Sequence, residues 1–415
     1  MAAKFQITGQ LGALMLGTAL GAGGASAQEI DLWTLNFSSE ASNDALEAIA
    51  EEFEASHPGV DVVITQRGVD EIKTALRVAA GSNTGPDIFF SWAGLGLGGE
   101  YVNAGMSLPL DAYYEQYGWN ESLLPTAAAF ADQYEGGKHG VPFTFKGEVV
   151  YYNKTLFEKA GIEGEPESYE ELLTAAEQLK EAGIPAFTFG GTVNWHLMRL
   201  MDVLVETECG AETHDALKAM EASWSDTPCA TAAFEELKTW TDDYILSPFM
   251  GIDQAQSFNL FAAGRAAMML EGNWLVQQLA EVADLENFGI FPFPTGTDRL
   301  YGFAEYHYVS ANSEHPDLAA EFLDFFNSTE IQQKHLGAFA TNSVNAEVSY
   351  ADQRPLDAEW TEIFEGYDAM FVNGDQGFPA SVTSEYFRVI NEVANGDLAP
   401  ADAAATLQGY IENLG

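Results

Sequence analysis

Strands and helices alternate regularly in the first part of the chain. Short apolar runs at 30–33, 60–65 and 86–92 are predicted strands, and two stretches with helical spacing of apolar residues lie between them. The third run, PDIFFSW, is apolar at nearly every position, which indicates a strand that is covered on both faces. The order strand, helix, strand, helix, strand favours an α/β fold built on a doubly wound parallel sheet.

A second α/β unit starts near residue 140. Runs at 138–145, 149–154 and 185–190 are rich in β-branched and aromatic residues and are predicted strands. Ser168 and Glu171 have the spacing of a capping box, so a helix is expected to begin there. Further along, 288–296 reads as a strand before a crossover, 300–313 as a strand pair and 316–327 as a helix. A chain of 415 residues exceeds what one core usually serves, which predicts two lobes.

The N-terminus has the pattern of a secretory signal peptide. Lys4 precedes an apolar, glycine-rich stretch, and Ala25-Ser26-Ala27 forms an A-x-A cleavage site. We expect residues 1–27 to be removed, with the mature chain exported to the periplasm. An uncleaved membrane anchor is the alternative. The chain has no cysteine near the cleavage site, so it is not predicted to be a lipoprotein.

Charge and motifs exclude several classes of function. The chain has 63 acidic and 17 basic residues and a net charge of -46, so its surface repels nucleic acids and anionic membranes. It has no G-x-S-x-G, P-loop or H-E-x-x-H motif, and its seven histidines lack metal-ligand spacing. We therefore predict no catalytic residue, no metal and no cofactor. So many acids guarantee some carboxylate pair at any spacing, and such pairs do not indicate a glycosidase.

The two cysteines, Cys209 and Cys229, are predicted to form a disulfide, because an exported protein with one close pair favours oxidation. Closing a loop of about 20 residues would stabilise the fold by roughly 3 kcal/mol in the chain-entropy model. Two buried thiols are the alternative. Neither cysteine is given a catalytic role.

Several aromatic residues stand where an apolar run gives way to a polar loop: Trp92, Trp195, Trp274, Tyr306 and Tyr308. Polar residues flank them, namely Ser91, Asn194, Glu271, Asn273, Glu305 and His307. In open α/β sheets, ligands bind beyond the carboxyl ends of strands. An aromatic face suits the C–H face of a pyranose ring, and amides and carboxylates suit its hydroxyls. The pattern predicts a carbohydrate site, whereas for any single aromatic an ordinary core position is the alternative.

Two further groups complete the candidate site. Asn36 and Phe37 lie in the polar loop that follows the first strand. Lys146 and Arg67 are cations in a chain that has few of them, and Lys146 could bind sugar hydroxyls or an anionic substituent. Arg199 is a third cation of interest, but we do not assign it to the site. The alternative for Lys146 is a surface salt bridge with Glu148.

Two segments resemble the extracellular sugar-binding proteins of ABC importers, within the maltose and oligosaccharide-binding superfamily. In 137–162, Gly140-Val141-Pro142 leads into YYNKTLFEKAGI, as in that family. AGRAAMMLEGNW at 263–274 is similar to the family's G-x-A-A-M-x-x-x-G-x-W, which ends at Trp274. Other similar stretches are PGV at 58–60, PDI at 86–88, LPLD at 108–111 and SANSEHPDLAAEFLDFF at 310–326. The likeness covers nearly the whole mature chain.

The resemblance implies the two-lobed periplasmic binding protein fold (type II), with lobes joined by crossing hinge strands. We assign 28–138 plus 297–340 to the N-terminal lobe and 139–296 plus 341–415 to the C-terminal lobe. The resemblance also implies that Trp274 stacks on a sugar in the cleft, that the lobes close around it, and that ABC permease subunits receive it. We expect a monomer that is not an enzyme.

The ligand is left open at this stage. Where relatives often have Gly-Gly, this chain has Gly302-Phe303-Ala304-Glu305, which adds bulk and charge, and Lys146 is also a less usual residue. The same scaffold could therefore bind a charged solute such as a sugar acid or sulfonate, glycerol-3-phosphate or a polyamine. A secreted glycoside hydrolase is a third hypothesis.

Overall fold

The structure, a computed structural model, describes residues 28–37, 39–82, 84–350, 353–367 and 369–414. The predicted signal peptide, 1–27, lies outside the described residues. In the described part of the chain, no helix is long and apolar enough to cross a membrane. No group of three or more His, Cys, Asp or Glu side chains in the same residues could hold a metal ion.

The first five elements have the predicted order: β1 (Gln28–Leu35), α1 (Glu40–Ser56), β2 (Val60–Arg67), α2 (Val69–Ser82) and β3 (Ile88–Trp92). β1 pairs in parallel with both β2 and β3, which confirms the doubly wound unit. The spacing of apolar residues in α1 buries Leu46, Ile49 and Phe53 against this sheet. Short helices follow: α3 (Gly98–Asn103), α4 (Asp111–Tyr117), α5 (Trp119–Ser122), α6 (Pro125–Ala128) and the 3₁₀ turn η1 (Ala129–Gln133).

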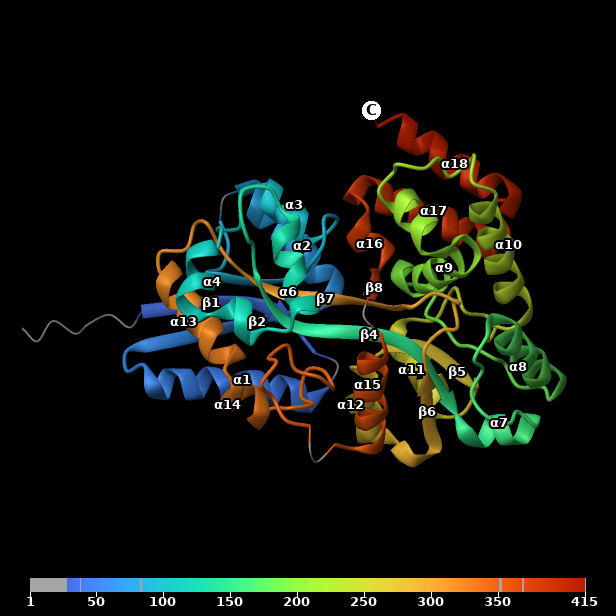
Figure 1. Cartoon of the computed structure of the whole chain (residues 1–415), viewed down its shortest axis with the longest axis horizontal. Coiled ribbons are helices and arrows are strands. Elements are labelled where there is room, and N and C mark those ends of the chain that lie inside the picture. The colour runs from blue at the N-terminus through green and yellow to red at the C-terminus, as the bar shows by residue number, and fades with distance from the viewer. Residues whose placement is uncertain (1–27, 38, 83, 351–352, 368, 415) are drawn as a thin grey trace, which may run out of the picture.

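Two long antiparallel strands, β4 (Val141–Asn153) and β7 (Arg299–Val309), run between the two bodies of the molecule (Figure 1). The sheet order is β2-β1-β3-β7-β4-β5, with β6 on β4 and β8 on β7. The predicted strand pair at 300–313 is wrong, because β7 is a single strand. It is hydrogen-bonded to β3 and β4, and so does not fold back on itself.

The second body is richer in helices. Its elements before β7 are α7 (Lys154–Ala160), α8 (Tyr169–Glu181), α9 (Asn194–Lys218), α10 (Pro228–Asp243), α11 (Gln254–Ala262), β5 (Met268–Gly272), α12 (Leu275–Val282), η2 (Leu285–Asn287) and β6 (Phe288–Phe291). After β7, α13 (Pro316–Asn327) and α14 (Thr329–Lys334) pack on the first body. The chain then returns to the second with α15 (Pro355–Gly366), β8 (Ala369–Val372), α16 (Gly374–Gly377), α17 (Ala380–Asn395) and α18 (Pro400–Glu412).

Local predictions in this second body had mixed outcomes. The Ser168 side chain accepts the N–H of Glu171 at the start of α8, as predicted, but the Glu171 carboxylate accepts the N–H of Glu167 and leaves the capping box half formed. The predicted strand 185–190 does not form. Only isolated β-bridges are present, in which Phe187 pairs with Ile245 and with Met268. The predicted disulfide is confirmed, with Sγ atoms of Cys209 and Cys229 2.04 Å apart.

Buried side chains show where the chain passes from one body to the other. On β4, Phe145 belongs to the core of the first body and Val149 to a small core beside β5. On β7, Tyr301 lies in the core of the second body and Ala304 in that of the first. The chain passes between the two bodies on β4 and again on β7. Its third passage comes after Val344, the last buried residue of the first core. Each passage comes a few residues later than the predicted lobe boundaries at 139, 297 and 341.

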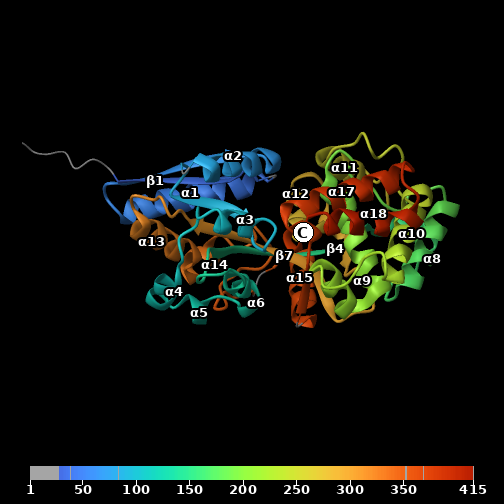
Figure 2. The ribbon, with the colours of Figure 1, turned by 90° about the horizontal axis from the view of Figure 1, so that it is seen from above.

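From here on, we call the first body, which surrounds the first core, the N-terminal half, and the second body the C-terminal half. Figure 2 shows the two halves from above, with β4 and β7 between them. Lys146 to Glu148 on β4 and Gly302 to Phe303 on β7 thus occupy the middle of the molecule. Lys146 pairs with Phe303 and Gly147 with Gly302 in the ladder at this point.

Candidate functional site

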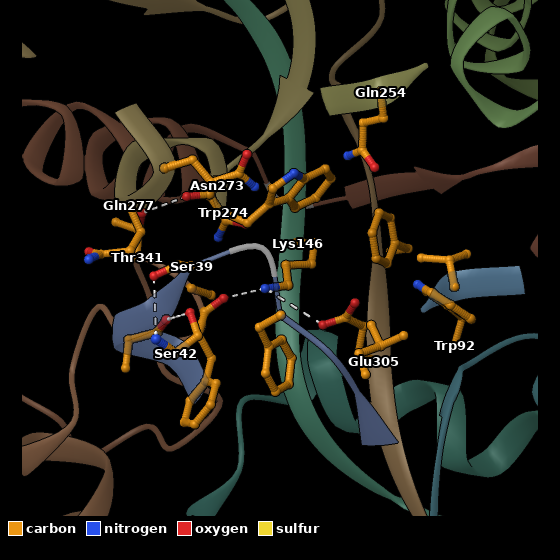
Figure 3. Close-up of a pocket in the computed structure, with 18 of the residues that line it drawn as sticks. Ser39, Ser42, Trp92, Lys146, Gln254, Asn273, Trp274, Gln277, Glu305 and Thr341 are labelled. Carbon is orange, nitrogen blue, oxygen red and sulfur yellow. Dashed lines mark hydrogen bonds and ion pairs between the residues drawn. The ribbon is translucent and has the colours of Figure 1, made fainter. Parts of the chain in front are cut away.

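A pocket lies between the two halves and is lined by residues from both (Figure 3). It encloses about 1030 Å³ of empty space, including the part that is open to solvent. Its aromatic lining residues are Phe37, Trp92, Trp195, Trp274, Phe303 and Phe339. The pocket is therefore a mixed surface of flat rings and polar groups, placed where the strands pass between the halves.

The pocket brings together eight residues that were predicted from sequence: Asn36, Phe37, Trp92, Lys146, Trp195, Asn273, Trp274 and Glu305. They come from loops after β1 and β5, the end of β3, the middle of β4 and β7, and the first turn of α9. Strand ends and crossing strands thus converge on one cavity, as expected for ligand sites in open α/β sheets.

Trp274 is positioned by the two residues before it. β5 ends at Gly272, where an added Cβ would lie 1.8 Å from the Trp274 ring, so only glycine leaves room for the indole. The Asn273 side chain donates to the carbonyl of Phe145 at 3.2 Å, and its backbone N–H donates to that of Gly147 at 3.1 Å. The sequence EGNW therefore fixes a half-buried indole at the pocket wall.

Arg199 connects two of the indoles. Its guanidinium carbon lies 4.5 Å from the ring centroid of Trp195 and 5.1 Å from that of Trp274, both within cation–π range. Its Nη1 donates to Glu271 at 2.7 Å, and its Nε contacts the Glu148 carboxylate. Since Arg199 is almost completely buried, these contacts hold the two rings in a fixed relation.

Two glutamates and a histidine form a buried layer behind the indoles. The Gly190 N–H donates to Nδ1 of His196 at 2.7 Å, so the histidine carries its proton on Nε2 and donates it to Glu271 at 3.0 Å. Burial lowers the pKa of His196 and keeps it neutral. Burial, aided by repulsion from Glu271, outweighs Arg199 and raises the pKa of Glu148 to about 8. For Glu271, Arg199 and His196 outweigh burial and lower the pKa.

These shifts leave one ionised carboxylate for one guanidinium. Glu148 holds a proton at neutral pH, Glu271 is charged, and Arg199 balances it. Together with Arg199, the layer behind the indoles is therefore neutral overall, although all four groups, His196 among them, can ionise.

Lys146 lies in the same wall. Its side chain is only 5% exposed, its Nζ is 3.6 Å from Glu305 and also contacts the carbonyl of Phe339. The alternative of a surface salt bridge with Glu148 is wrong, because Lys146 is buried and Glu148 is engaged by Arg199. Burial lowers the pKa of Lys146. Figure 3 shows the ammonium joined by a dashed line to Glu305, and the centroid of the Trp274 ring lies 5.8 Å from Nζ.

The structure does not bring the other predicted residues to the pocket. Tyr306 and His307 are buried in the core of the N-terminal half, and Tyr308 bonds there to Tyr134. Along β7 the pocket reaches only Phe303 and Glu305, and the strand then enters the core. Three further predicted residues lie elsewhere: Glu271 behind the indoles, Asn194 at a neighbouring cavity beside Asn391, and Arg67 over the Trp33 ring.

Sequence reasoning missed much of the lining. The missed residues are Leu35, Ser39, Ser42, Val69, Lys73, Gln254, Gln277, Gln278, 337–341, Arg354, Asn373, Asp375 and Gln376, while Arg199 and Phe303 were noticed but not assigned to the site. Lys73 pairs with Asp375 at 3.6 Å and stands 4.7 Å from the Trp92 centroid. The available signals were the glycine-rich run AGLGLGG after Trp92 and the polar run NGDQG at 373–377, both typical of close backbone approach.

Comparisons with known proteins agree with this arrangement. A family model described as bacterial extracellular solute-binding protein matches residues 38–333. The chain is 23% identical over 400 residues to an uncharacterized ABC transporter extracellular-binding protein of Pyrococcus horikoshii, over 93% of this chain and 83% of the relative. It is 24% identical over 294 residues to the maltotriose-binding protein of Pyrococcus abyssi, over 68% and 59% of the two chains.

A solved structure of a chitin oligosaccharide binding protein superimposes with a TM-score of 0.85 at 23% identity, and covers 94% of this chain and 100% of that chain. This match confirms the predicted two-lobed fold.

Proposed function

The chain belongs to the family of bacterial extracellular solute-binding proteins, and we propose that it captures a carbohydrate in the pocket between its halves and delivers it to the permease of an ABC importer. The observation that carries the choice of ligand is the pair of indoles, Trp195 and Trp274, held on Arg199 at the pocket wall. Flat aromatic faces beside amides and carboxylates suit a pyranose ring and its hydroxyls. The maltotriose-binding relative supports the same class of ligand.

Capture would proceed by a shift between open and closed forms. The ligand docks on one half, and contacts made only in the closed form draw the second half onto it. A micromolar dissociation constant corresponds to about -8 kcal/mol, which stacked rings and several hydrogen bonds can supply. We further propose that residues 1–27 direct export to the periplasm and are removed there, and that the mature protein acts as a monomer without nucleic acid.

A charged solute is the second candidate, because four cations line the pocket: Lys73, Lys146, Arg199 and Arg354. Each one, however, is already paired with a carboxylate: Lys73 with Asp375, Lys146 with Glu305, Arg199 with Glu271, and Arg354 with Asp357. Paired cations offer little free charge to an anionic ligand, and their carboxylates offer little to a polyamine. The arrangement therefore favours a neutral sugar over either.

A thermal-shift screen tests the proposal, because a ligand that binds the folded state raises the melting temperature. The panel contains monosaccharides, disaccharides, trisaccharides, sugar acids, glycerol-3-phosphate and polyamines. We expect neutral sugars to give the largest shifts. If neutral sugars leave the melting temperature unchanged while a phosphate ester or a sugar acid raises it, the charged-solute candidate replaces the proposal. A reducing-end assay with oligosaccharides should show no turnover.

A further inference from the structure

The loop after β3 forms a fixed platform at one end of the pocket, in the N-terminal half. The Gly94 N–H donates to the hydroxyl of Tyr134 at 3.1 Å, and that hydroxyl lies 2.9 Å from the hydroxyl of Tyr308. The Gly99 N–H donates to the Gly94 carbonyl at 2.9 Å and closes the loop on itself. Both tyrosines are buried, so the loop is tied to the core of its own half.

α16 forms a second platform, in the C-terminal half. The Gly374 N–H donates to Asp202 at 2.7 Å, and the same buried carboxylate accepts the hydroxyls of Tyr301 at 2.8 Å and Tyr386 at 2.9 Å. Phe378, directly after the helix, is fully buried in the core of the C-terminal half. α16 is therefore anchored at both of its ends.

The two platforms meet backbone to backbone. The Gly96 N–H donates to the Gln376 carbonyl at 3.0 Å. A Cβ on Gly96 would lie 2.1 Å from the carbonyl oxygen of Phe378 and 2.4 Å from that of Asp375, and it would meet no atom of its own half as closely. Beside this contact, Lys73 and Asp375 form an ion pair between the halves at 3.6 Å. Gly96 thus permits an approach that any larger residue would prevent.

Residues beside this contact form part of the pocket wall. Lys73, Asp375 and Trp195 line both the main pocket and a neighbouring cavity. The rest of that cavity is largely polar and includes Asp70, Arg77, Asn194, Thr192, Thr383 and Ser384. The Lys73–Asp375 pair therefore stands at the boundary between the two spaces, next to the Trp92 ring.

We propose that the loop around Gly96 and α16 form a clasp that holds the halves together and closes this end of the pocket, so that a saccharide in the site ends at the Lys73–Asp375 pair. The choice of a saccharide rests on the proposed function; the clasp itself does not. The clasp makes closure depend on a backbone contact that exists only when the halves meet. It also separates the main pocket from the neighbouring cavity, which a longer chain would otherwise enter.

Gly96→Ala tests the clasp, with Gly81→Ala as the matched control. Gly81 lies in the same half, on the exposed side of α2, and a Cβ there meets nothing within 4 Å. Titration calorimetry is carried out with the tightest-binding solute of the screen and with two homologues one sugar unit longer, one extended at the reducing end and one at the non-reducing end. Small-angle scattering records the radius of gyration of each protein with and without solute. Circular dichroism checks that all variants fold alike.

We expect wild type and Gly81→Ala to become more compact with the parent sugar and to gain no affinity from the added unit in at least one of the two homologues. Gly96→Ala should bind the parent sugar at least tenfold more weakly, compact less, and bind that homologue as well as the parent sugar or better. If Gly96→Ala compacts and binds like wild type, the clasp is refuted. If wild-type affinity rises with the added unit in both homologues, the wall is refuted. If only a non-carbohydrate solute binds, the proposed function fails. The clasp is then tested with that solute: it is supported if Gly96→Ala compacts less than Gly81→Ala, and refuted if both compact alike.

Discussion

Replacing Glu148 with glutamine tests whether one of the two glutamates beside Arg199 keeps its proton at neutral pH. Burial and the charge of Glu271 raise the pKa of Glu148 from 4.5 to about 8. Each tenfold change in proton affinity is worth about 1.4 kcal/mol, so the raised pKa corresponds to at most about 5 kcal/mol of folding free energy. Because the folded state holds this proton more tightly than the unfolded chain, the contribution is complete below about pH 4.5 and is lost as the pH rises toward 8.

Glu148→Gln keeps the shape of the protonated acid and cannot ionise. As the pH rises, wild type loses this contribution and the variant does not. The free energy of unfolding of the variant should therefore increase relative to that of wild type, with most of the change between about pH 5 and pH 8. Urea denaturation followed by circular dichroism at intervals across this range measures the difference, and taking the difference cancels groups that titrate alike in both proteins. A difference that stays constant with pH would show that folded Glu148 is ionised, and would refute the reasoning.

Glu271→Gln is the matched control, because it makes the same change in the same buried layer. Glu271 accepts hydrogen bonds from both His196 and Arg199, one on each oxygen. A glutamine would set its amide N–H against one of these donors and leave a buried group unpaired. We expect a loss of about 3 kcal/mol at pH 7 for this variant, against little or no loss for Glu148→Gln.

Three further changes test the site and the scaffold. Trp274→Ala should keep the fold and weaken ligand binding at least tenfold, or about 1.4 kcal/mol, in titration calorimetry; loss of native circular dichroism would show instead that the indole is structural. Gly272→Ala should weaken binding in the same assay, because its Cβ would displace the Trp274 ring, and unchanged binding would contradict that placement. Replacing both Cys209 and Cys229 with serine should lower the unfolding free energy by about 3 kcal/mol in urea denaturation but leave ligand affinity unchanged, since neither lines the pocket.

Local spacing determined the first part of the fold. Apolar runs and helical periodicity predicted β1 to β3 with α1 and α2 between them, because each pattern depends on residues a few positions apart. The same reasoning found Trp92, Trp195 and Trp274, since an aromatic residue at the point where an apolar run ends is visible in the chain. Two close cysteines in an exported chain were enough to predict the disulfide.

Errors arose where the answer depends on what lies beside a strand. The segment 300–313 contains polar and aromatic residues that suit a strand pair as well as one long strand, and only its pairing with both β3 and β4 decides the matter. Tyr306 and His307 follow Glu305 directly in the sequence and carry polar groups as it does, so the local pattern does not distinguish them from a pocket residue. They are buried because β7 enters the core of the N-terminal half just beyond Glu305.

The tertiary structure alone decided which distant segments share the pocket. Lys73, Arg199 and Asp375 come from three different helices, and no local pattern relates them. Their meeting depends on three passages of the chain between the halves, and on glycines at 94 and 96, where an added Cβ would collide with residues 375–378 of the other half. The sequence thus determined the strands and helices of the first part of the chain and three indoles of the pocket, because these follow from neighbours along the chain. Packing between the halves determined the pairing of charges and the closed end of the site, because these follow from neighbours in space.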